Sequence, residues 1–438
     1  MSLRTLLAGP IARGTIVSLL IRLCGIGLGV IQAILTARLL GPEGYGAIAM
    51  VLSLSMILAT IALVGTEMLS VREVAKYVAT GDTERLHGFL RASRLLVIAT
   101  MVFGAFVVVL VLPQLPLAAE FHSVLIYAVF LFPIFALVLQ NQAILRGIGQ
   151  TALSQIPFQI LRPVILVSVL LSCFISGIQI GTTGYLNTAI AGAVSALILA
   201  WLATVRFIPK RKAAPEAMSI ANLAQHSSPF FVISILGLLL GEVSTLMLAW
   251  WSTPEQTGLF QPIARIAPLL LIGAQAASIR YASRLSELWT QGQMKKIEQI
   301  TRLFTLVSTF IAVGMAMAFV LFGKVLLGIF GTEFATNTTA LWVVAGGQIF
   351  NAAFGPVGLL LTMTNRASFV VWPQIAALIA TLISGYALIP EMGVLGAAVA
   401  MSIGTISLNA TLLIIVRRKM GFDPSIVGIL LGERSAGV

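Results

Sequence analysis

Long apolar runs constrain this chain more than any other feature. Each is about 20 residues long, enough for a helix to cross the roughly 30 Å hydrocarbon core of a bilayer at 1.5 Å per residue. Hydrophobic residues make up 58% of the chain and charged residues only 10%, whereas about a quarter of a soluble domain is charged. Strands of an outer-membrane barrel would alternate over about 10 positions, and these runs do not. We therefore predict an all-α integral membrane protein.

The runs predict twelve spans, six in each half of the chain. Their predicted ranges are 14–37, 46–67, 92–112, 122–143, 152–174, 183–205, 226–249, 258–280, 303–323, 340–362, 369–388 and 394–416. With both termini cytoplasmic, 22 of the 27 Lys and Arg residues fall in cytoplasmic segments, and only Arg38 and Lys324 fall in outer ones. A missed span would exchange the two sides and remove this bias. The charge therefore predicts a multi-pass protein of the cytoplasmic (inner) membrane, and it gives no reason to expect nucleic acid as a partner.

A short motif repeats at a step of about 210 residues. Pro42-Glu43 is followed by Gly46, and Pro254-Glu255 by Gly258, each time between two apolar runs. Such repeats in transporters place the substrate site where the two halves meet. We expect a six-helix bundle at 1–210, the end of a cytoplasmic linker at 211–225, a second bundle at 226–420 and a cytoplasmic tail at 421–438.

Four charged residues lie where the spans should be apolar: Arg22, Arg162, Glu242 and Arg265. A charge at the centre of a span costs roughly 2.5–3.5 kcal/mol on insertion scales, so such residues are candidates for function. Glu242 and Arg265 lie at equal distances from the middle of the intervening turn. Antiparallel helices would bring them to one depth, either as a structural ion pair or as a coupling pair whose acid takes up a proton.

Arg22 and Arg162 have no acidic residue at matching depth in the neighbouring predicted spans. A guanidinium group donates two parallel hydrogen bonds to phosphate or carboxylate oxygens, so both residues suit an anionic substrate, as does Arg265 when released from Glu242. The alternative is snorkelling of the side chain to the interface. Four glutamines could extend the candidate cavity, although each alone is better explained by an interhelical hydrogen bond: Gln32, Gln155, Gln159 and Gln374. We find no metal-binding, cofactor-binding or catalytic motif and expect a transporter, not an enzyme.

Four segments resemble one known family. They are ARLLGPEGYGAIAM, TGLFQPIARI, LGIFGTEFATNTTAL and IPEMGVLGAAVAMSIG, in this order along the chain. Together they resemble the polysaccharide transporter branch of the multidrug/oligosaccharidyl-lipid/polysaccharide (MOP) exporter superfamily, to which the MATE transporters also belong. The resemblance implies two six-helix bundles related by a twofold axis along the membrane normal, around a cavity that opens alternately to each side. It also places Arg22 and Glu242 at positions where the family carries charged residues.

The implied activity is flipping of an undecaprenyl-diphosphate-linked oligosaccharide, such as an O-antigen unit of lipopolysaccharide, to the outer leaflet. Its partners would be this anionic lipid, membrane lipids and polysaccharide assembly proteins. The alternative is an ion-coupled exporter of drugs or other small molecules in the same superfamily. A major-facilitator transporter would carry a G-x-x-x-D-R-x-G-R-R-like loop after the second span, and a membrane-embedded polysaccharide polymerase would need a large outer loop. The sequence contains neither.

Overall fold

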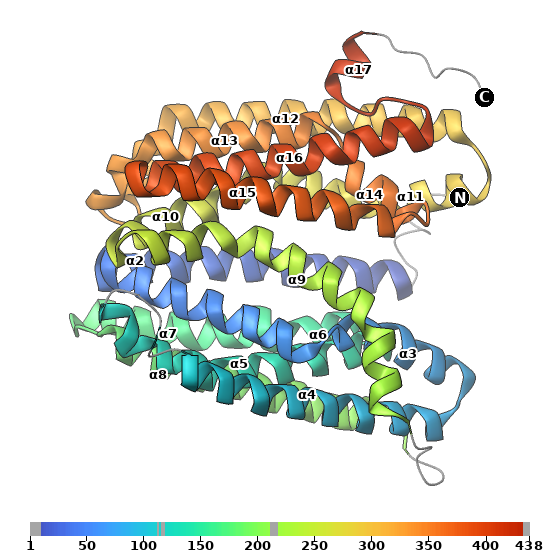
Figure 1. Cartoon of the computed structure of the whole chain (residues 1–438), viewed down its shortest axis with the longest axis horizontal. Helices are drawn as coiled ribbons and strands as arrows, with labels where there is room; N and C mark the ends of the chain where they lie inside the picture. The colour runs from blue at the N-terminus through green and yellow to red at the C-terminus, as the bar shows by residue number, and fades with distance from the viewer. Residues whose placement is uncertain (1–9, 112–113, 115–118, 211–217, 432–438) are drawn as a thin grey trace. The chain divides into compact units, whose positions relative to one another are not determined.

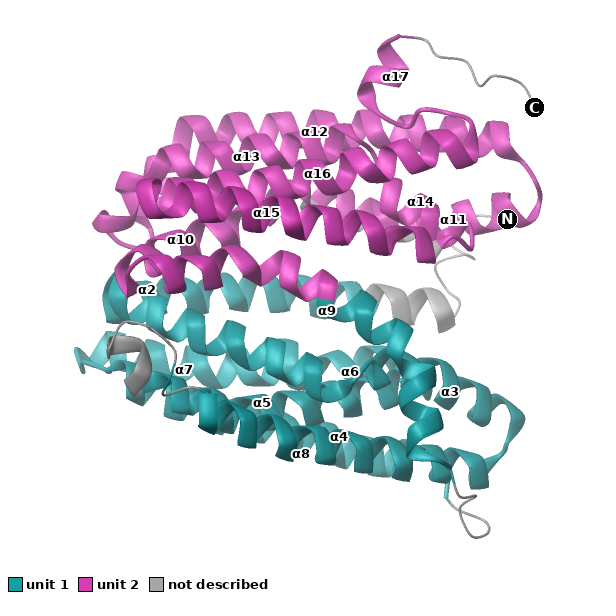
Figure 2. Cartoon of the chain, in the orientation of Figure 1, with its two compact units in different colours: residues 1–235 teal, residues 236–438 magenta. Residues whose placement is uncertain are grey.

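The computed structural model describes residues 10–111, 114, 119–210 and 218–431, and these ranges consist of helices joined by short turns, with no strand (Figure 1). The chain forms two compact units, Met1–Ile235 and Leu236–Val438, coloured separately in Figure 2. The division falls inside one long helix, α9 (Ile220–Trp251). Residues 211–217 of the predicted linker segment 211–225 and the chain ends 1–9 and 432–438 lie outside the described residues, and α9 begins within that segment, at Ile220.

The first unit is built around one central helix, α5 (Ala119–Gly147). Leu125, Phe132 and Ile144 of this helix are fully buried, and α5 packs against α2, α3, α6 and α8. The other helices of this unit are α2 (Pro10–Leu63), α3 (Thr66–Thr80), α4 (Thr83–Val111), α6 (Thr151–Ile156), the π-helix η2 (Pro157–Leu161), α7 (Arg162–Ser176), α8 (Thr182–Phe207) and the first part of α9.

The predicted break between the first two spans lies at Gly41, where α2 divides into two helical parts. Its apolar part, Val17–Leu63, has 47 residues, about twice the length needed for one crossing. Gly41 alone breaks the helical conformation, with φ 66° and ψ −176°. Glycine adopts this positive φ without a steric penalty, and Pro42 can begin the next helix because its missing N–H needs no partner there.

The segment predicted as a loop after the second span contains a helix, α3. Leu69, Val74 and Tyr77 are buried on one side of α3, while Arg72 and Lys76 are exposed on the other. This spacing is that of an amphipathic helix. Its charged residues make α3 too polar to be recognised as a membrane span from the sequence. Two glycines in the left-handed conformation, Gly65 and Gly81, flank α3.

The second unit contains the rest of α9 and the remaining helices of the chain. These are α10 (Pro254–Ile266), the 3-10 helix η3 (Ala267–Leu271), α11 (Ile272–Thr290), α12 (Met294–Gly328), η4 (Thr332–Asn337), α13 (Thr338–Ala353), α14 (Val357–Met363), η5 (Ala367–Val370), α15 (Val371–Met392), α16 (Val394–Met420) and α17 (Ile426–Leu430). Helix α16 packs along α15 and α13. Two predicted spans, 258–280 and 340–362, are bent by more than 40°, near Pro268 and Pro356.

The described residues contain nine helices long and apolar enough to cross a membrane, or eleven if each bent pair is one span. Counting the two parts of α2 on either side of Gly41 separately gives the twelve spans that the sequence predicts. In the predicted tail, α17 is anchored by an ion pair between Arg417 and the buried Asp423. The Asp423 carboxylate also accepts a hydrogen bond from the backbone N–H of Ser425 at 2.8 Å.

Candidate functional site

Arg162 lies against two aromatic rings inside the first unit. Its guanidinium carbon is 4.8 Å from the ring centre of Phe135 on α5 and 4.9 Å from that of Phe158 on η2. The two rings meet edge to face, with centroids 5.5 Å apart. Pro157 opens η2, and the backbone N–H of Arg162 bonds to the Pro157 carbonyl in the wider π-helical pattern. Arg162 is near the middle of the span Thr151–Ser176, so the rings stabilise a cation at a depth where burial is costly.

Arg22 lies on α2, close to where that helix meets η2. A Cβ atom at Gly25 would be 3.0 Å from the backbone oxygen of Gln159, so the absence of a side chain lets the two helices approach closely. Arg22 and Arg162 are each three residues from this crossing. The fold of the first unit therefore brings the two predicted arginine segments together, although they are far apart in sequence. The Arg22 side chain is exposed and that of Arg162 is half-buried.

The four predicted glutamines divide into two kinds. Gln32 donates from Nε2 to the hydroxyl of Tyr185 on α8 at 2.7 Å, and Gln155 donates to the Thr151 carbonyl one turn earlier at 3.2 Å. These two therefore have a structural hydrogen bond. Gln159 and Gln374 instead each bury a side-chain oxygen for which the described residues supply no hydrogen-bond partner. An unsatisfied buried amide oxygen is costly, which makes these two the better candidates for contact with a ligand or water.

The register of α9 against α10 is fixed by a buried hydrogen bond in the second unit. Gln261 donates from Nε2 to the Thr245 hydroxyl oxygen at 3.3 Å. Because the helices are antiparallel about the intervening turn, this bond places Glu242 and Arg265 at nearly the same level. Glu242 is half-buried and Arg265 is exposed.

A cavity of about 340 Å³ within the second unit is lined by uncharged polar side chains. Asn409 on α16 donates to the Asn351 side-chain oxygen at 3.1 Å, and Asn351 on α13 donates to that of Gln348 at 3.1 Å. Gln374 on α15 also lines the cavity. Amides and hydroxyls both donate and accept hydrogen bonds, so the cavity suits a hydroxyl-rich group better than an ion. The full lining is Leu240, Gln348, Asn351, Gly358, Val370, Gln374, Thr381, Met401, Gly404, Thr405, Leu408, Asn409 and Leu412.

Gln374 of this cavity is one of the four glutamines singled out from the sequence, and Gln348, Asn351 and Asn409 are also polar residues within the predicted spans. Thr381 and Thr405 were missed because single threonines in spans usually bond to their own backbone, as both do here. Gly404 was missed as well: a Cβ atom there would lie 2.0 Å from the Thr381 hydroxyl oxygen. The asparagines and glutamines of the last spans indicated a polar site in this part of the chain. The sequence does not show which of these side chains face one another.

Residues 11–282 match the family described as polysaccharide biosynthesis protein. The match covers well over half of the chain, from α2 to most of α11, and includes all four charged residues of the predicted spans. The chain belongs to this family. A curated relative, the "Probable low-salt glycan biosynthesis flippase Agl15" of Haloferax volcanii, is 23% identical over 216 residues. These residues are 49% of this chain and 45% of the relative, so this family member spans about half the length of that relative.

Solved structures share the fold at low sequence identity. An inward-facing multidrug resistance MATE family transporter of the MOP superfamily superposes with a TM-score of 0.74 at 13% identity, over 92% of this chain and 98% of that one. The lipid II flippase MurJ, in an inward closed conformation, gives 0.71 at 14%, over 92% and 87%. A MOP superfamily transporter from Pyrococcus furiosus, described as having a binding pocket of reverse polarity, gives 0.61 at 15%, over 95% and 97%. The predicted all-α transporter fold and the resemblance to the polysaccharide branch of the MOP superfamily are thus confirmed.

Proposed function

We propose that this multi-pass membrane protein flips an undecaprenyl-diphosphate-linked oligosaccharide, such as an O-antigen unit, across the cytoplasmic membrane. The observation that carries the proposal is the family match over residues 11–282. The relative from Haloferax volcanii, named as a glycan biosynthesis flippase, supports the same substrate class. Both termini would be cytoplasmic, as the distribution of Lys and Arg predicts. Alternating access would expose the binding site to one leaflet at a time.

The diphosphate would bind to Arg22 and Arg162. Their segments meet at the crossing of α2 and η2. The contacts of Arg162 with Phe135 and Phe158 use the charge of the guanidinium group and not its N–H donors. The two rings thereby hold a side chain of the type that makes bidentate contacts with phosphate.

The sugar hydroxyls would bind to amides. Gln159 and Gln374 bury oxygens that need donors, and the second unit's cavity presents Gln348, Asn351 and Asn409 beside Gln374. Neutral amides recognise hydroxyl groups without requiring a charge on the sugar. Arginines and amides would thus recognise chemically different parts of such a substrate.

Energy coupling is proposed for Glu242 and Arg265, which share one level of α9 and α10. Protonation of the Glu242 carboxylate would remove its attraction for the guanidinium group and release Arg265 towards the substrate. The Glu242→Gln variant mimics the protonated acid. It should lose the dependence of flipping on a pH gradient, and normal gradient-driven flipping by this variant would exclude the coupling step.

The proposal is tested in a bacterial strain that lacks its own O-unit flippase. We expect the protein to restore surface glycan, and Arg22→Gln or Arg162→Gln to reduce it at least tenfold at equal membrane abundance. Arg206→Gln is the matched control, because Arg206 is exposed at the end of α8 and belongs to no predicted site. Equal losses for Arg162→Gln and Arg206→Gln would contradict the role of the site. Resistance to cationic drugs without surface glycan would show instead a multidrug exporter, the activity named for the MATE neighbour.

A further inference from the structure

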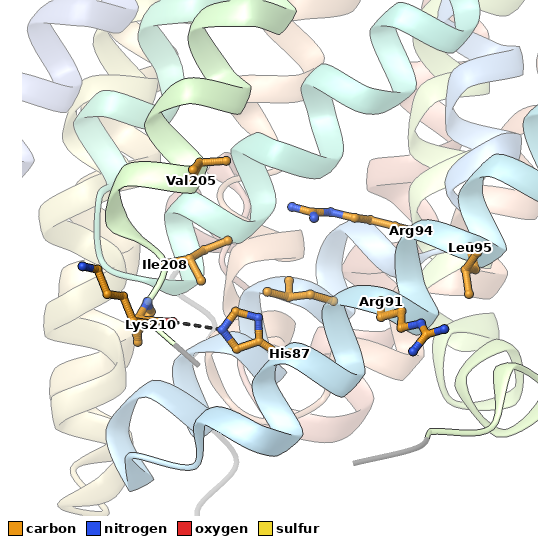
Figure 3. A pocket seen from close by; sticks show the side chains of 9 residues that line it. His87, Arg91, Arg94, Leu95, Val205, Ile208 and Lys210 are labelled. Carbon is orange, nitrogen blue, oxygen red and sulfur yellow. Dashed lines mark hydrogen bonds between the residues drawn. The ribbon is translucent and has the colours of Figure 1, made fainter. Parts of the chain in front are cut away.

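A basic pocket of about 530 Å³ lies in the first unit, where the beginning of α4 meets the end of α8 (Figure 3). Four of its lining residues carry basic side chains: His87, Arg91, Arg94 and Lys210. The others are Leu90, Leu95, Val205, Ile208 and Pro209, so the described lining contains no acidic residue. The predicted substrate site does not include any of them.

The pocket is built by a contact between the two chain segments. The His87 ring nitrogen Nε2 is 3.0 Å from the carbonyl oxygen of Pro209, and this hydrogen bond joins the first turns of α4 to the residues that follow α8. Figure 3 shows Arg94 extending from α4 on the side where Val205 and Ile208 lie. Its side chain is half-buried, whereas Arg91 and Lys210 are exposed.

One edge of the pocket continues into apolar surface that faces away from the unit. Phe103 on α4 is 68% exposed and Trp201 on α8 is 50% exposed, which in a membrane protein identifies the surfaces that contact acyl chains. Leu95 and Val205 belong to the exposed apolar residues of these helices and also line the pocket. The basic side chains therefore begin where the lipid-facing apolar surface ends, at the level of lipid headgroups.

The corresponding place in the second half of the chain is different. The internal repeat relates Arg91 to Arg302 on α12. Arg302, however, forms an ion pair with Glu298 at 2.6 Å. Thr305 stands at the position that corresponds to Arg94, and its hydroxyl bonds to the Thr301 carbonyl. If these basic residues served only to place positive charge at the membrane surface, both halves of the chain would carry them at the same positions. The pocket is therefore a specific feature of the first half.

We propose that this pocket binds the phosphate group of an anionic phospholipid from the leaflet that the charge distribution predicts to be cytoplasmic. Arg91, Arg94 and Lys210 supply donors for the phosphate oxygens, and the acyl chains follow the apolar surfaces of α4 and α8. Basic pockets between spans on this side of a membrane are suited to such headgroups. A volume of about 530 Å³ falls within the range of small-ligand sites. The site is separate from the residues proposed for the flipped substrate.

The test measures lipid binding to the purified full-length protein by native mass spectrometry, with phosphatidylglycerol as the probe. Arg94→Gln should weaken binding about fivefold, as expected for the loss of one basic side chain at the membrane surface. Arg206→Gln removes the same charge from the exposed end of α8 outside the pocket and should change binding less than twofold. Arg94→Lys keeps the charge and should retain most of the binding, which shows that the position tolerates substitution.

Three further probes identify the ligand. Zwitterionic phosphatidylcholine should bind at least fivefold more weakly than phosphatidylglycerol, and inorganic phosphate at millimolar concentration should not displace the lipid. Equal losses for Arg94→Gln and Arg206→Gln, or equal binding of the two lipids, would overturn the proposal. Displacement by inorganic phosphate would show a site for the free ion. An undecaprenyl diphosphate that binds more tightly than phosphatidylglycerol, and loses that affinity in Arg94→Gln, would assign the pocket to the flipped substrate instead.

Discussion

The contact between Arg162 and its two aromatic neighbours predicts a measurable coupling energy. Each ring centre is just under 5 Å from the guanidinium carbon. A cation–π contact contributes about 0.5–1 kcal/mol at exposed sites and about 2 kcal/mol when desolvated. Arg162 and Phe158 are both half-buried, so we expect about 1 kcal/mol from their pair. Phe158→Leu keeps an apolar side chain and removes only the ring.

The coupling is measured by a double-mutant cycle of Phe158→Leu and Arg162→Met. The free energy of unfolding would be followed in mixed micelles for the protein, the two single variants and the double variant. Loss of ordinary packing at Phe158 is common to both backgrounds and cancels, and the remainder is the cation–π energy. A coupling below about 0.3 kcal/mol, the usual error of additivity, would refute the assignment.

The same variants separate stability from transport. If Arg162 contacts the diphosphate, Arg162→Met should abolish flipping, because no donor remains. Phe158→Leu leaves the guanidinium group in place and should retain more than half of the flipping activity at equal abundance. Equal transport defects in both variants would mean that Arg162 acts only through the fold of the first unit.

Two further predictions concern the backbone and the tail. Gly65 has φ 75°, and a Cβ atom there would be 2.3 Å from the Ser227 carbonyl oxygen, so Gly65→Ala should lower the free energy of unfolding by more than 3 kcal/mol or prevent folding. Gly81 has φ 71° with open space around it; Gly81→Ala should therefore cost only the left-handed strain of about 1–2 kcal/mol, and equal losses in the two variants would contradict the proposed contact. Asp423→Asn removes the charge that binds Arg417 while an amide oxygen can still accept from Ser425, so hydrogen exchange should accelerate at least tenfold in residues 421–431. Unchanged exchange there would show that the ion pair does not hold α17.

The existence and number of the membrane-spanning helices follow from the sequence, because hydrocarbon leaves no alternative partner for the backbone. An apolar run of about 20 residues must satisfy every N–H and C=O within itself, and the helix is the structure that does so. The internal repeat and the positions of Arg22, Arg162, Glu242 and Arg265 could be found in the same way. The composition and the lengths of the apolar runs were sufficient for the class of protein, and the resemblance of four sequence segments indicated the family.

Side-chain neighbours could not be predicted, and the physical reason is the similarity of lipid to a protein interior. A span that is apolar on all sides has no strong periodicity to show which face is buried, because the lipid tails are as apolar as the neighbouring helices. The sequence therefore does not reveal that Phe135 lies beside Arg162, or that Asn351, Gln374 and Asn409 line one cavity. Only the packing of the helices brought these residues together, and with them the arrangement from which a function can be proposed.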